Sequence, residues 1–277
     1  MEQKERAYLE QKCTRVRYLT IDEIGELGVG HAGGCMSIVE AIVLLYYKHM
    51  NIDPENPKKK GRDRFILSKA HAGPTLYATL ADKGYFPLDC LMTLNKPGTA
   101  LPSHADMLRT PGVDMTAGSL GQGLSCAVGI AIGSRLSKDN AAIYAMIGDG
   151  ESQEGQIWEA AMYAAQMKLD NMICFTDFNN MQLDGPIEEI NGLEPLTDKW
   201  KAFGWNVWSV DGHDIEAIDT AIQAAKNKNG KPSMIILNTL KGKGVSFLEE
   251  SYLNNHNVTI SPEQRCAALE ELKAGCK

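Results

Sequence analysis

The chain has 277 residues, of which 44% are hydrophobic and 23% charged, and its formal net charge is −7. This composition is ordinary for a soluble globular protein, and the acidic balance argues against nucleic acid as the main partner, because nucleic-acid binders usually carry basic patches. We expect no signal peptide and no membrane span, since the first residues are charged and no stretch approaches the ~18 apolar residues that a span needs. Seven scattered cysteines without CxxC pairs predict free thiols and a cytoplasmic location.

The N-terminal region is predicted to be mainly helical. Residues 2–24 form a helix-length stretch of mixed charge, and a glycine-dense loop follows at 28–35. Ser37 is expected to begin and cap the next helix, because serine is a favoured N-cap. Residues 51–60 are polar and basic and contain prolines, which predicts an exposed loop.

A short strand at 64–68 and a helix around 76–80 are predicted next. Residues 95–123 are rich in glycine and lack hydrophobic periodicity. Loops of this length in compact domains are usually functional or disordered, and the glycines together with His104 favour function here. A helix rich in alanine and glycine is predicted at 124–136.

The most informative stretch is 141–185. An apolar run at 141–147 is typical of a buried strand, and it ends at Gly148-Asp149-Gly150. A helical pattern follows, and a second apolar run at 172–176 ends at Asp177-Phe178-Asn179-Asn180. Strand, helix and strand at this spacing predict a βαβ unit, because parallel strands need such a crossover.

Strands and helices continue to alternate toward the C-terminus. No repeat or linker interrupts the chain, so we expect a single domain over 1–277 with an α/β fold, namely a doubly wound, mostly parallel sheet with helices on both faces. The expected order is a helix that ends at 200–203, a strand at 205–210, a helix at 215–225, a strand at 233–239, a turn at 241–244 and a polar tail.

Oxygen ligands follow both strands of the βαβ unit. Because the carboxyl ends of parallel strands meet at one edge of a sheet, the Asp149 carboxylate, the Asn179 amide oxygen and a backbone carbonyl near Met181 are expected to converge. Such oxygen ligands suit Mg²⁺ or Ca²⁺. Gly148 and Gly150 let a ligand approach the backbone, and the following helix offers free N–H groups to an anion. A cation site beside a helix N-terminus predicts that the ligand is a diphosphate. The alternative is that Gly148-Asp149-Gly150 is only a tight turn and Asn179-Asn180 only a loop, with no ligand.

Four of the six histidines lie in predicted loops rather than on the faces of elements. Histidine both accepts and donates protons near neutral pH, so a group of them suits a substrate with several hydroxyl groups. His49 and His213 are expected to be structural, and Cys35 is expected to be a small buried residue. The four loop histidines are His31, His71, His104 and His256.

These motifs resemble those of transketolase. GDGESQEGQIWEAA followed by TDFNNMQLDG is similar to the thiamine diphosphate motif of that family, and GVGHAGG, FILSKAHAGPTLYA, LPSHADM and KGKGVSFLEE with His256 are similar to its four histidine motifs. The matches run in family order from about Gly25 to His256. The resemblance implies thiamine diphosphate and Mg²⁺ or Ca²⁺ as cofactors, and the transfer of a two-carbon ketol unit from a ketose to an aldose.

The resemblance also implies roles for individual residues. His31, His104 and His256 are expected to face the sugar. Glu154 corresponds to a glutamate that links paired active sites across a dimer interface, and it is grouped with the catalytic residues. The cation is expected on Asp149, Asn179 and the Met181 carbonyl, and the cofactor on His71, Gly118, Ser119, Leu120, Gly148, Asp149, Gly150, Glu151 and Asn179.

The sequence departs from the family pattern beside the histidines. The family usually has Pro, Gly, Pro and Gly where this chain has Ala32, Ala70, Ala105 and Asn257. The expected cation ligands are unchanged. Because the departures cluster where the substrate is expected, the identity of the sugar and of its terminal anion, phosphate or sulfonate, stays open.

In single-chain transketolases a second half carries the pyrimidine-binding and C-terminal domains, with the glutamate that activates the cofactor. Nothing in this sequence matches that half, so we expect it on a separate partner chain. The expected assembly is an α2β2 heterotetramer that is active only when both chains are present. Two alternatives are the alpha subunit of a 2-oxoacid dehydrogenase and a non-catalytic paralogue that binds thiamine diphosphate.

Overall fold

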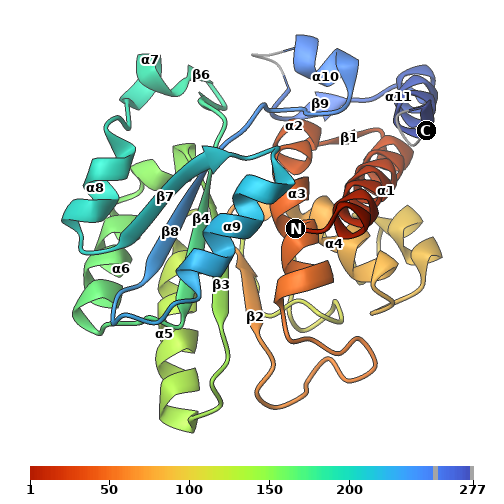
Figure 1. The fold of residues 1–277 in the computed structure, drawn as a ribbon. Helices are drawn as coiled ribbons and strands as arrows, with labels where there is room; N and C mark the ends of the chain where they lie inside the picture. The colour runs from red at the N-terminus through yellow and green to blue at the C-terminus, as the bar shows by residue number, and fades with distance from the viewer. Residues whose placement is uncertain (252–254, 275–277) are drawn as a thin grey trace.

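The structure is a computed structural model that describes residues 1–251 and 255–274. Its centre is a five-stranded sheet in which all neighbouring strands run parallel, in the order β2-β3-β4-β8-β7 (Figure 1). Two short antiparallel pairs, β1 with β9 and β5 with β6, lie outside this sheet. The expected mostly parallel sheet is therefore confirmed. The strands are β1 (Val29–Gly30), β2 (Arg64–Leu67), β3 (Ile143–Gly148), β4 (Met172–Phe178), β5 (Met181–Gln182), β6 (Gly185–Pro186), β7 (Asn206–Asp211), β8 (Ser233–Asn238) and β9 (Val258–Thr259).

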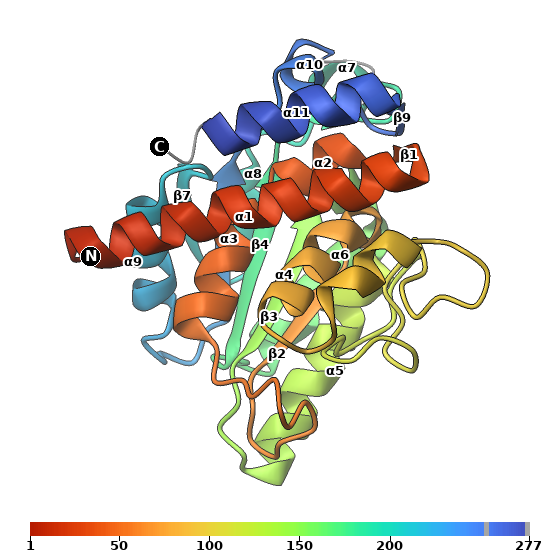
Figure 2. The same cartoon turned by 90° about the vertical axis from the view of Figure 1, so that its right-hand side faces the viewer.

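Helices cover both faces of the sheet (Figures 1 and 2), which confirms the predicted double winding. Tyr144 and Met146 of β3 belong to a hydrophobic core shared with α1, α3, α4 and α9. Ile143, Ala145 and Ile147 belong to a second core shared with α5, α6 and α8. Successive side chains of a strand point to opposite faces, so a strand that is covered on both faces is apolar throughout. The α-helices are α1 (Gln3–Leu27), α2 (Ala32–Met36), α3 (Val39–Leu44), α4 (Gly73–Asp82), α5 (Gln122–Ser137), α6 (Gly155–Gln166), α7 (Ile187–Asn191), α8 (Leu196–Ala202), α9 (Ile215–Ala225), α10 (Ser246–Glu250) and α11 (Pro262–Ala274), with a π-helical turn at Leu45–His49 and 3₁₀ turns at Ala70–Ala72, Leu88–Thr93 and Gly150–Gln153.

The register of β3 and β4 fixes the edge at which the chain leaves the sheet. Gly148 lies opposite Asp177, and the Asp149 N–H donates to the Asp177 carbonyl at 3.1 Å. The two strands therefore end side by side, and Asp149 and Asn179 are the residues at which they turn out of the sheet. Ligands of parallel α/β sheets bind at this carboxyl edge.

The prediction that Ser37 caps a helix is wrong. Ser37 follows the last residue of α2, and α3 begins at Val39 after Ile38, which makes no side-chain cap. The Ser37 hydroxyl donates to Gly34 O at 3.2 Å and to Asp177 Oδ2 at 2.7 Å. A contact with a residue so far along the chain leaves no local signal in the sequence.

Two further expectations need correction. The tail is not merely polar, because it contains α10 and α11, and Arg265 of α11 donates to Asp22 and Glu26 of α1, each at 2.7 Å. Only Ala268 and Leu272 of α11 are buried, which explains its weak hydrophobic pattern. The helix expected directly after Gly150 is a 3₁₀ turn, and α6 begins only at Gly155.

Among the described residues, no helix combines the length and the apolar character needed to cross a membrane. The six cysteines in the described ranges are all free thiols, as expected, and Cys35 is fully buried. Cys276 lies outside the described residues.

Glu23 is an unusual feature of α1. Its side chain is fully buried, and neither carboxylate oxygen has a hydrogen-bond partner among the described residues. Burial, with a smaller contribution from the neighbouring charge of Asp22, raises the pKa of Glu23 well above its ordinary value. The native protein therefore keeps this carboxyl protonated at pH values where the unfolded chain has released the proton.

Replacing Glu23 by Met, a side chain of similar length, is expected to raise the free energy of unfolding by about 1–3 kcal/mol at pH 8, the usual cost of a buried polar group without a partner. Because the raised pKa belongs to the folded state, wild-type stability falls as the pH rises above the ordinary glutamate pKa, and the gain from Met is smaller at pH 5 than at pH 8. Urea unfolding at both pH values measures the difference. A variant no more stable than the wild type at pH 8 contradicts the assignment.

Candidate functional site

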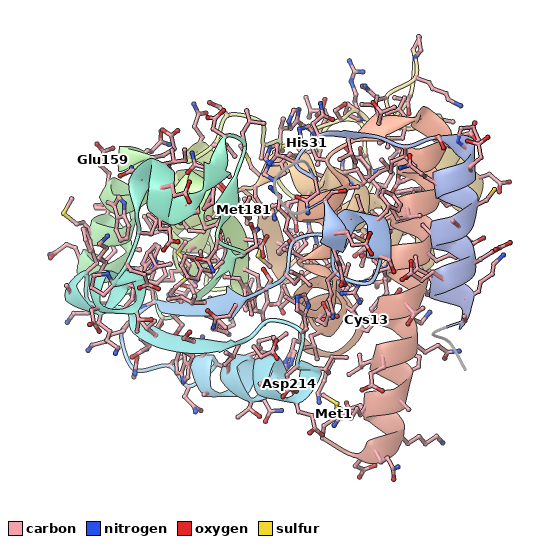
Figure 3. All side chains as sticks on the ribbon, turned by 90° about the horizontal axis from the view of Figure 1, so that it is seen from above. Met1, Cys13, His31, Glu159, Met181 and Asp214 are labelled. Atoms are coloured by element: carbon pink, nitrogen blue, oxygen red, sulfur yellow. The ribbon has the colours of Figure 1, made fainter. Side chains whose placement is uncertain are left out.

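A cavity of about 300 Å³ opens at the carboxyl edge of the sheet, between the β3 and β4 ends and the turn after β8. Figure 3 looks down on the molecule from this side and labels Met181 and His31. The predicted site residues that line this cavity are His71, Leu120, Gly148, Asp149, Gly150, Glu151, Glu154, Asn179, Met181 and His256. His104, Gly118 and Ser119 line a second cavity of about 560 Å³.

Asp149 offers one free carboxylate oxygen. Its Oδ1 accepts the Gly150 N–H at 2.8 Å, whereas Oδ2 is buried and has no hydrogen-bond partner among the described residues. Burial first, and then the nearby charge of Asp177, raise the pKa of Asp149 to about 7. Buried carboxylate oxygens normally accept a hydrogen bond, so a buried carboxylate oxygen that accepts none is what is expected of a cation ligand.

The amide of Asn179 is held in one orientation. Its Nδ2 donates to Asp177 Oδ2 at 3.0 Å, and its Oδ1 accepts the Met181 N–H at 3.1 Å. These two bonds fix which end of the amide carries the oxygen, as groups behind a metal ligand commonly do. The role of the Met181 carbonyl as a third ligand stays a prediction.

Asp177, which the sequence interpretation did not single out, holds the edge of the sheet together. Its buried carboxylate accepts hydrogen bonds from Lys69 Nζ at 2.5 Å, Ser37 Oγ at 2.7 Å and Thr239 Oγ1 at 2.5 Å. Lys69 is 1% exposed and also donates to Gly34 O at 2.9 Å. Burial alone would raise the pKa of Asp177, but Lys69 lowers it below the ordinary value.

The carboxylate oxygens of Glu151 are hydrogen-bonded to other residues of the protein and are not free for a ligand. Its carboxylate accepts the Ser68 hydroxyl, the Gly121 N–H at 2.9 Å and the Gly148 N–H at 3.0 Å. Burial raises the pKa of Glu151 above its ordinary value. This carboxyl joins the long loop, through Gly121, to the turn that carries Asp149. Its predicted contact with a cofactor stays a prediction.

Three of the four predicted histidines lie together. The ring centroids of His31, His71 and His256 are 5.0 to 5.5 Å apart. Burial, followed by neighbouring charges, lowers the pKa of each of them, to about 4 for His256. Burial therefore favours the neutral form of all three rings, which is the form that can accept a proton. His104 is exposed in the adjoining cavity.

Lys241 is the second functional candidate that the sequence interpretation missed. Its side chain is buried, its Nζ lies 3.2 Å from His256 Nδ1, and it lines the same cavity as Asp149 and Asn179. Burial lowers the pKa of Lys241 to about 8. A buried ammonium group that faces a cavity is suited to an anion. Its signal in the sequence is Lys241-Gly242-Lys243-Gly244, which was predicted only as a turn.

Glu154 is exposed in this chain, so its expected position in a dimer interface stays a prediction. The described residues contain no cluster of three His, Cys, Asp or Glu side chains that could hold a metal alone. A cation at Asp149 would therefore depend on amide and carbonyl oxygens and on the oxygens of a bound anion, which is the mixed set that the sequence predicts.

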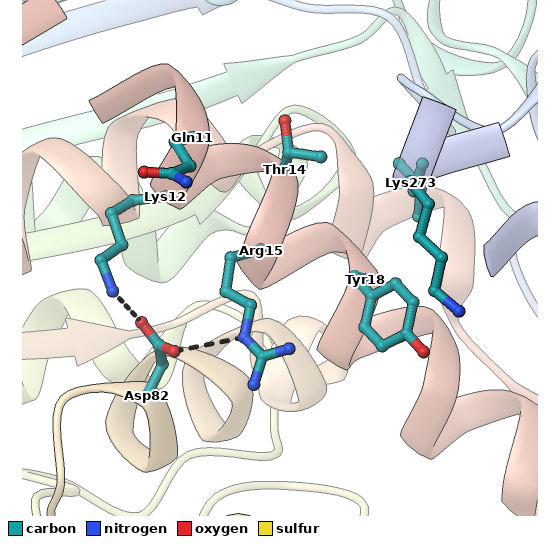
Figure 4. Close-up of a pocket in the computed structure, with 8 residues that line it drawn as sticks. Gln11, Lys12, Thr14, Arg15, Tyr18, Asp82 and Lys273 are labelled. Carbon is teal, nitrogen blue, oxygen red and sulfur yellow. Dashed lines mark hydrogen bonds and ion pairs between the residues drawn. The ribbon is translucent and has the colours of Figure 1, made fainter. Parts of the chain in front are cut away.

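A separate cavity of about 450 Å³ lies between α1, α4 and α11 (Figure 4). Lys12 and Arg15 of α1 line it, and both donate to Asp82 of α4. Tyr47 also donates to this carboxylate, at 2.5 Å. None of the predicted site residues lines this cavity, so it is a different part of the surface.

Comparison with known proteins identifies the family. A model of the family described as transketolase, thiamine diphosphate binding domain, matches residues 9–265. The chain is 57% identical over 265 residues to the 6-deoxy-6-sulfo-D-fructose transketolase subunit SqwG of Clostridium sp. (strain MSTE9), covering 96% of each chain. It is 40% identical over 266 residues to an apulose-4-phosphate transketolase subunit of Actinobacillus succinogenes, again covering 96% of each chain.

Solved structures agree with this comparison. The crystal structure of transketolase from Campylobacter jejuni superposes with a TM-score of 0.89 at 32% identity, over 96% of this chain. This chain spans 42% of the length of that enzyme chain, whereas it spans nearly all of the two subunits named above.

Replacing Lys69 by Met is expected to lower the free energy of unfolding by about 3–5 kcal/mol, because it leaves the Asp177 carboxylate buried without its cation. Removing the carboxylate charge as well, in Lys69→Met/Asp177→Asn, is expected to recover part of that loss. Denaturant unfolding of the single and double variants measures both.

The matched control is Lys201→Met, because Lys201 pairs with Asp198 at 3.5 Å and both side chains are more than half exposed. Its effect is expected to stay within about 1 kcal/mol. Equal effects of Lys69→Met and Lys201→Met would contradict the importance of the buried pair.

Proposed function

The chain belongs to the transketolase family, and on that premise we propose that it is the thiamine diphosphate-binding subunit of a two-chain transketolase. The observation that carries the proposal is the buried Oδ2 of Asp149, which no other described residue hydrogen-bonds, at the carboxyl edge of the sheet beside the oriented amide of Asn179. The transketolase subunits named above, which match this chain over nearly their whole length, support the same assignment.

The residues present fit a metal–diphosphate group. Asp149, Asn179 and the Met181 carbonyl would hold Mg²⁺ or Ca²⁺, and the Lys241 ammonium group would face the negative charge of the diphosphate. A Cβ at Gly150 would lie 3.1 Å from Gln182 Cβ at the wall of the cavity, so a larger residue there would require Gln182 to shift. Thiamine diphosphate, when bound, supplies the electron sink for breaking the carbon–carbon bond next to a carbonyl.

The protein supplies binding, orientation and proton transfer. The rings of His31 and His256, which lie beside the cofactor-binding candidate His71, can accept a hydroxyl proton of the sugar and return it later, which is the role of a general base and acid. His104 would bind the sugar from the adjoining cavity, which Gly118 and Ser119 also line. These histidines come from different loops, so the fold must be complete before they meet.

The proposed donor is a ketose that ends in an anion. The relative with 57% identity is named for 6-deoxy-6-sulfo-D-fructose, and the relative with 40% identity for apulose 4-phosphate. Of the two, the sulfonated ketose is the first candidate because that relative is more similar to this chain. The acceptor is an aldose, as ketol transfer requires.

The proposed partner is a separate chain that carries the pyrimidine-binding half, in an α2β2 heterotetramer. An apolar surface on α5 and α6 supports the presence of a neighbour: Leu136, Met162 and Tyr163 are 79%, 56% and 51% exposed. Leu183, beside the cofactor cavity, is 64% exposed. Because α5 and α6 pack against each other, the exposed apolar side chains of Leu136, Met162 and Tyr163 lie on neighbouring helices, as is common where a protein partner binds.

Replacing Asp149 by Ala is expected to weaken the binding of thiamine diphosphate with Mg²⁺ by more than about 100-fold, because a ligand is lost and not merely an orienting group. Calorimetry of the complex with its partner measures this. The matched control is Asp184→Ala, which removes an exposed carboxylate from the neighbouring turn and is expected to leave the affinity unchanged. His104→Ala is expected to bind the cofactor but lose turnover. Normal affinity in Asp149→Ala overturns the cation assignment.

The purified chain alone is expected to show no ketol transfer, and activity is expected to appear on addition of the partner, up to equal molar amounts. The donors to compare are 6-deoxy-6-sulfofructose and fructose 6-phosphate, with the sulfonate giving the higher kcat/KM. Full activity of the isolated chain would refute the two-chain proposal, and a preference for the phosphate would refute the proposed donor. Sedimentation of the mixture tests the α2β2 assembly.

A further inference from the structure

His213 lies in the loop between β7 and α9, and each of its ring nitrogens has one partner. The Leu240 N–H donates to Nε2 at 2.8 Å, and Nδ1 lies 3.2 Å from Glu40 Oε2. A backbone N–H can only donate, so Nε2 is the acceptor, and Nδ1 carries the hydrogen that is donated to Glu40. The histidine that the sequence predicted to be structural therefore joins α3 to the turn after β8.

Glu40 is shared with Arg17 of α1. Arg17 Nη2 donates to both carboxylate oxygens of Glu40, at 2.7 and 2.9 Å, and Arg17 Nε donates to the Lys243 carbonyl at 3.0 Å. Although burial alone would raise the pKa of Glu40, Arg17 and His213 lower it below its ordinary value. The ionised Glu40 carboxylate thus binds both the Arg17 guanidinium and the His213 imidazole. These two groups in turn are hydrogen-bonded to the backbone of the same turn, at Lys243 and Leu240.

The turn at 240–244 carries Lys241 into the cofactor cavity. Its backbone is held on one side of Lys241 through the Leu240 N–H and on the other through the Lys243 carbonyl. Between them the Gly242 N–H donates to the Gly33 carbonyl at 3.0 Å, with a φ of 90° that favours glycine. The Lys241 carbonyl also accepts the Asn255 Nδ2 at 3.2 Å, and the Gly244 N–H donates to Glu249 Oε1 at 2.7 Å. A turn held by several such bonds presents its side chain in a fixed direction.

The network itself does not reach the cofactor cavity. None of Arg17, Glu40 and His213 lines that cavity; all three line another one, of about 370 Å³. Figure 3 labels Cys13 and Asp214, which line this cavity of about 370 Å³, well apart from Met181, which lines the cofactor cavity. Other charged groups around the cavity of about 370 Å³ are Arg6, Glu10, Asp211 and Asp214.

We infer that His213, with Glu40 and Arg17, is a positioning residue that fixes the 240–244 turn so that the Lys241 ammonium group, which contacts the His256 ring, faces the diphosphate. The inference rests on the proposed function, because the diphosphate is the ligand of that site. Loss of the acceptor at Nε2 leaves the Leu240 N–H without a partner and lets the turn shift, which weakens cofactor binding without removing a contact to the cofactor.

The test compares three variants in the assembled complex: His213→Ala, His213→Gln and His49→Ala. Gln places an amide oxygen near the position of Nε2, so it restores the acceptor without the ring. His49 is the matched control, because its side chain is 5% exposed and its Nε2 lies 2.8 Å from Asp219 Oδ1. His49 does not line the cofactor cavity.

Calorimetric titration with thiamine diphosphate and Mg²⁺ is expected to show an affinity about 10-fold lower in His213→Ala, recovery to within about 2-fold of the wild type in His213→Gln, and no change in His49→Ala. Both alanine variants are expected to lower the Tm. The positioning role is overturned if the loss of cofactor affinity is proportional to the loss of Tm across the three variants, so that His49→Ala also binds more weakly. It is equally overturned if His213→Gln does not recover binding.

Hydrogen exchange of the peptide that contains residues 239–245 supplies a readout that needs no cofactor. Its exchange is expected to be faster in His213→Ala than in the wild type, and unchanged in His49→Ala. If the wild-type complex binds no thiamine diphosphate, the proposed function fails, whereas unchanged exchange in His213→Ala means that this inference fails.

Discussion

The carboxyl edge of the sheet depends on the buried charge pair between Lys69 and Asp177. The same carboxylate accepts hydrogen bonds from Ser37, Thr239 and Asn179, so it joins the ends of β2, β4 and β8 to the break between α2 and α3. A buried charge is stable only when its partners are all in place. The orientation of the candidate ligand Asn179 therefore depends on the same Asp177 carboxylate that pairs with Lys69.

Burial shifts the pKa values of the groups around the cavity toward their uncharged forms. It raises the pKa of Asp149 to about 7 and lowers the pKa of Lys241 to about 8 and that of His256 to about 4. A divalent cation beside the carboxylate and a diphosphate beside the ammonium group would each reverse the corresponding shift, since opposite charges favour the ionised form. The cation and the anion would therefore strengthen each other's binding.

The sequence predicted the parts of the fold that local pattern determines. The apolar runs that became β3 and β4 are buried on both faces, and the polar residues after them mark the edge of the sheet. Ser37, Lys69 and Asp177 were misjudged or missed because their partners lie far along the chain, and α11 was missed because so few of its residues are buried. The histidines were found through motifs, and only the fold brings three of them together.

The small ladder between β1 and β9 has a consequence for how the protein forms. Gly30 pairs with Val258, so β1 and β9 form a two-stranded antiparallel sheet that joins an N-terminal to a C-terminal segment. His31 directly follows β1, and His256 lies shortly before β9. During synthesis on the ribosome, all strands of the five-stranded sheet are present once β8 has emerged, but β1 cannot pair with β9 until β9 has followed. A nascent chain cut short between β8 and His256 would contain all five strands of the central sheet but would lack the third ring of the histidine cluster.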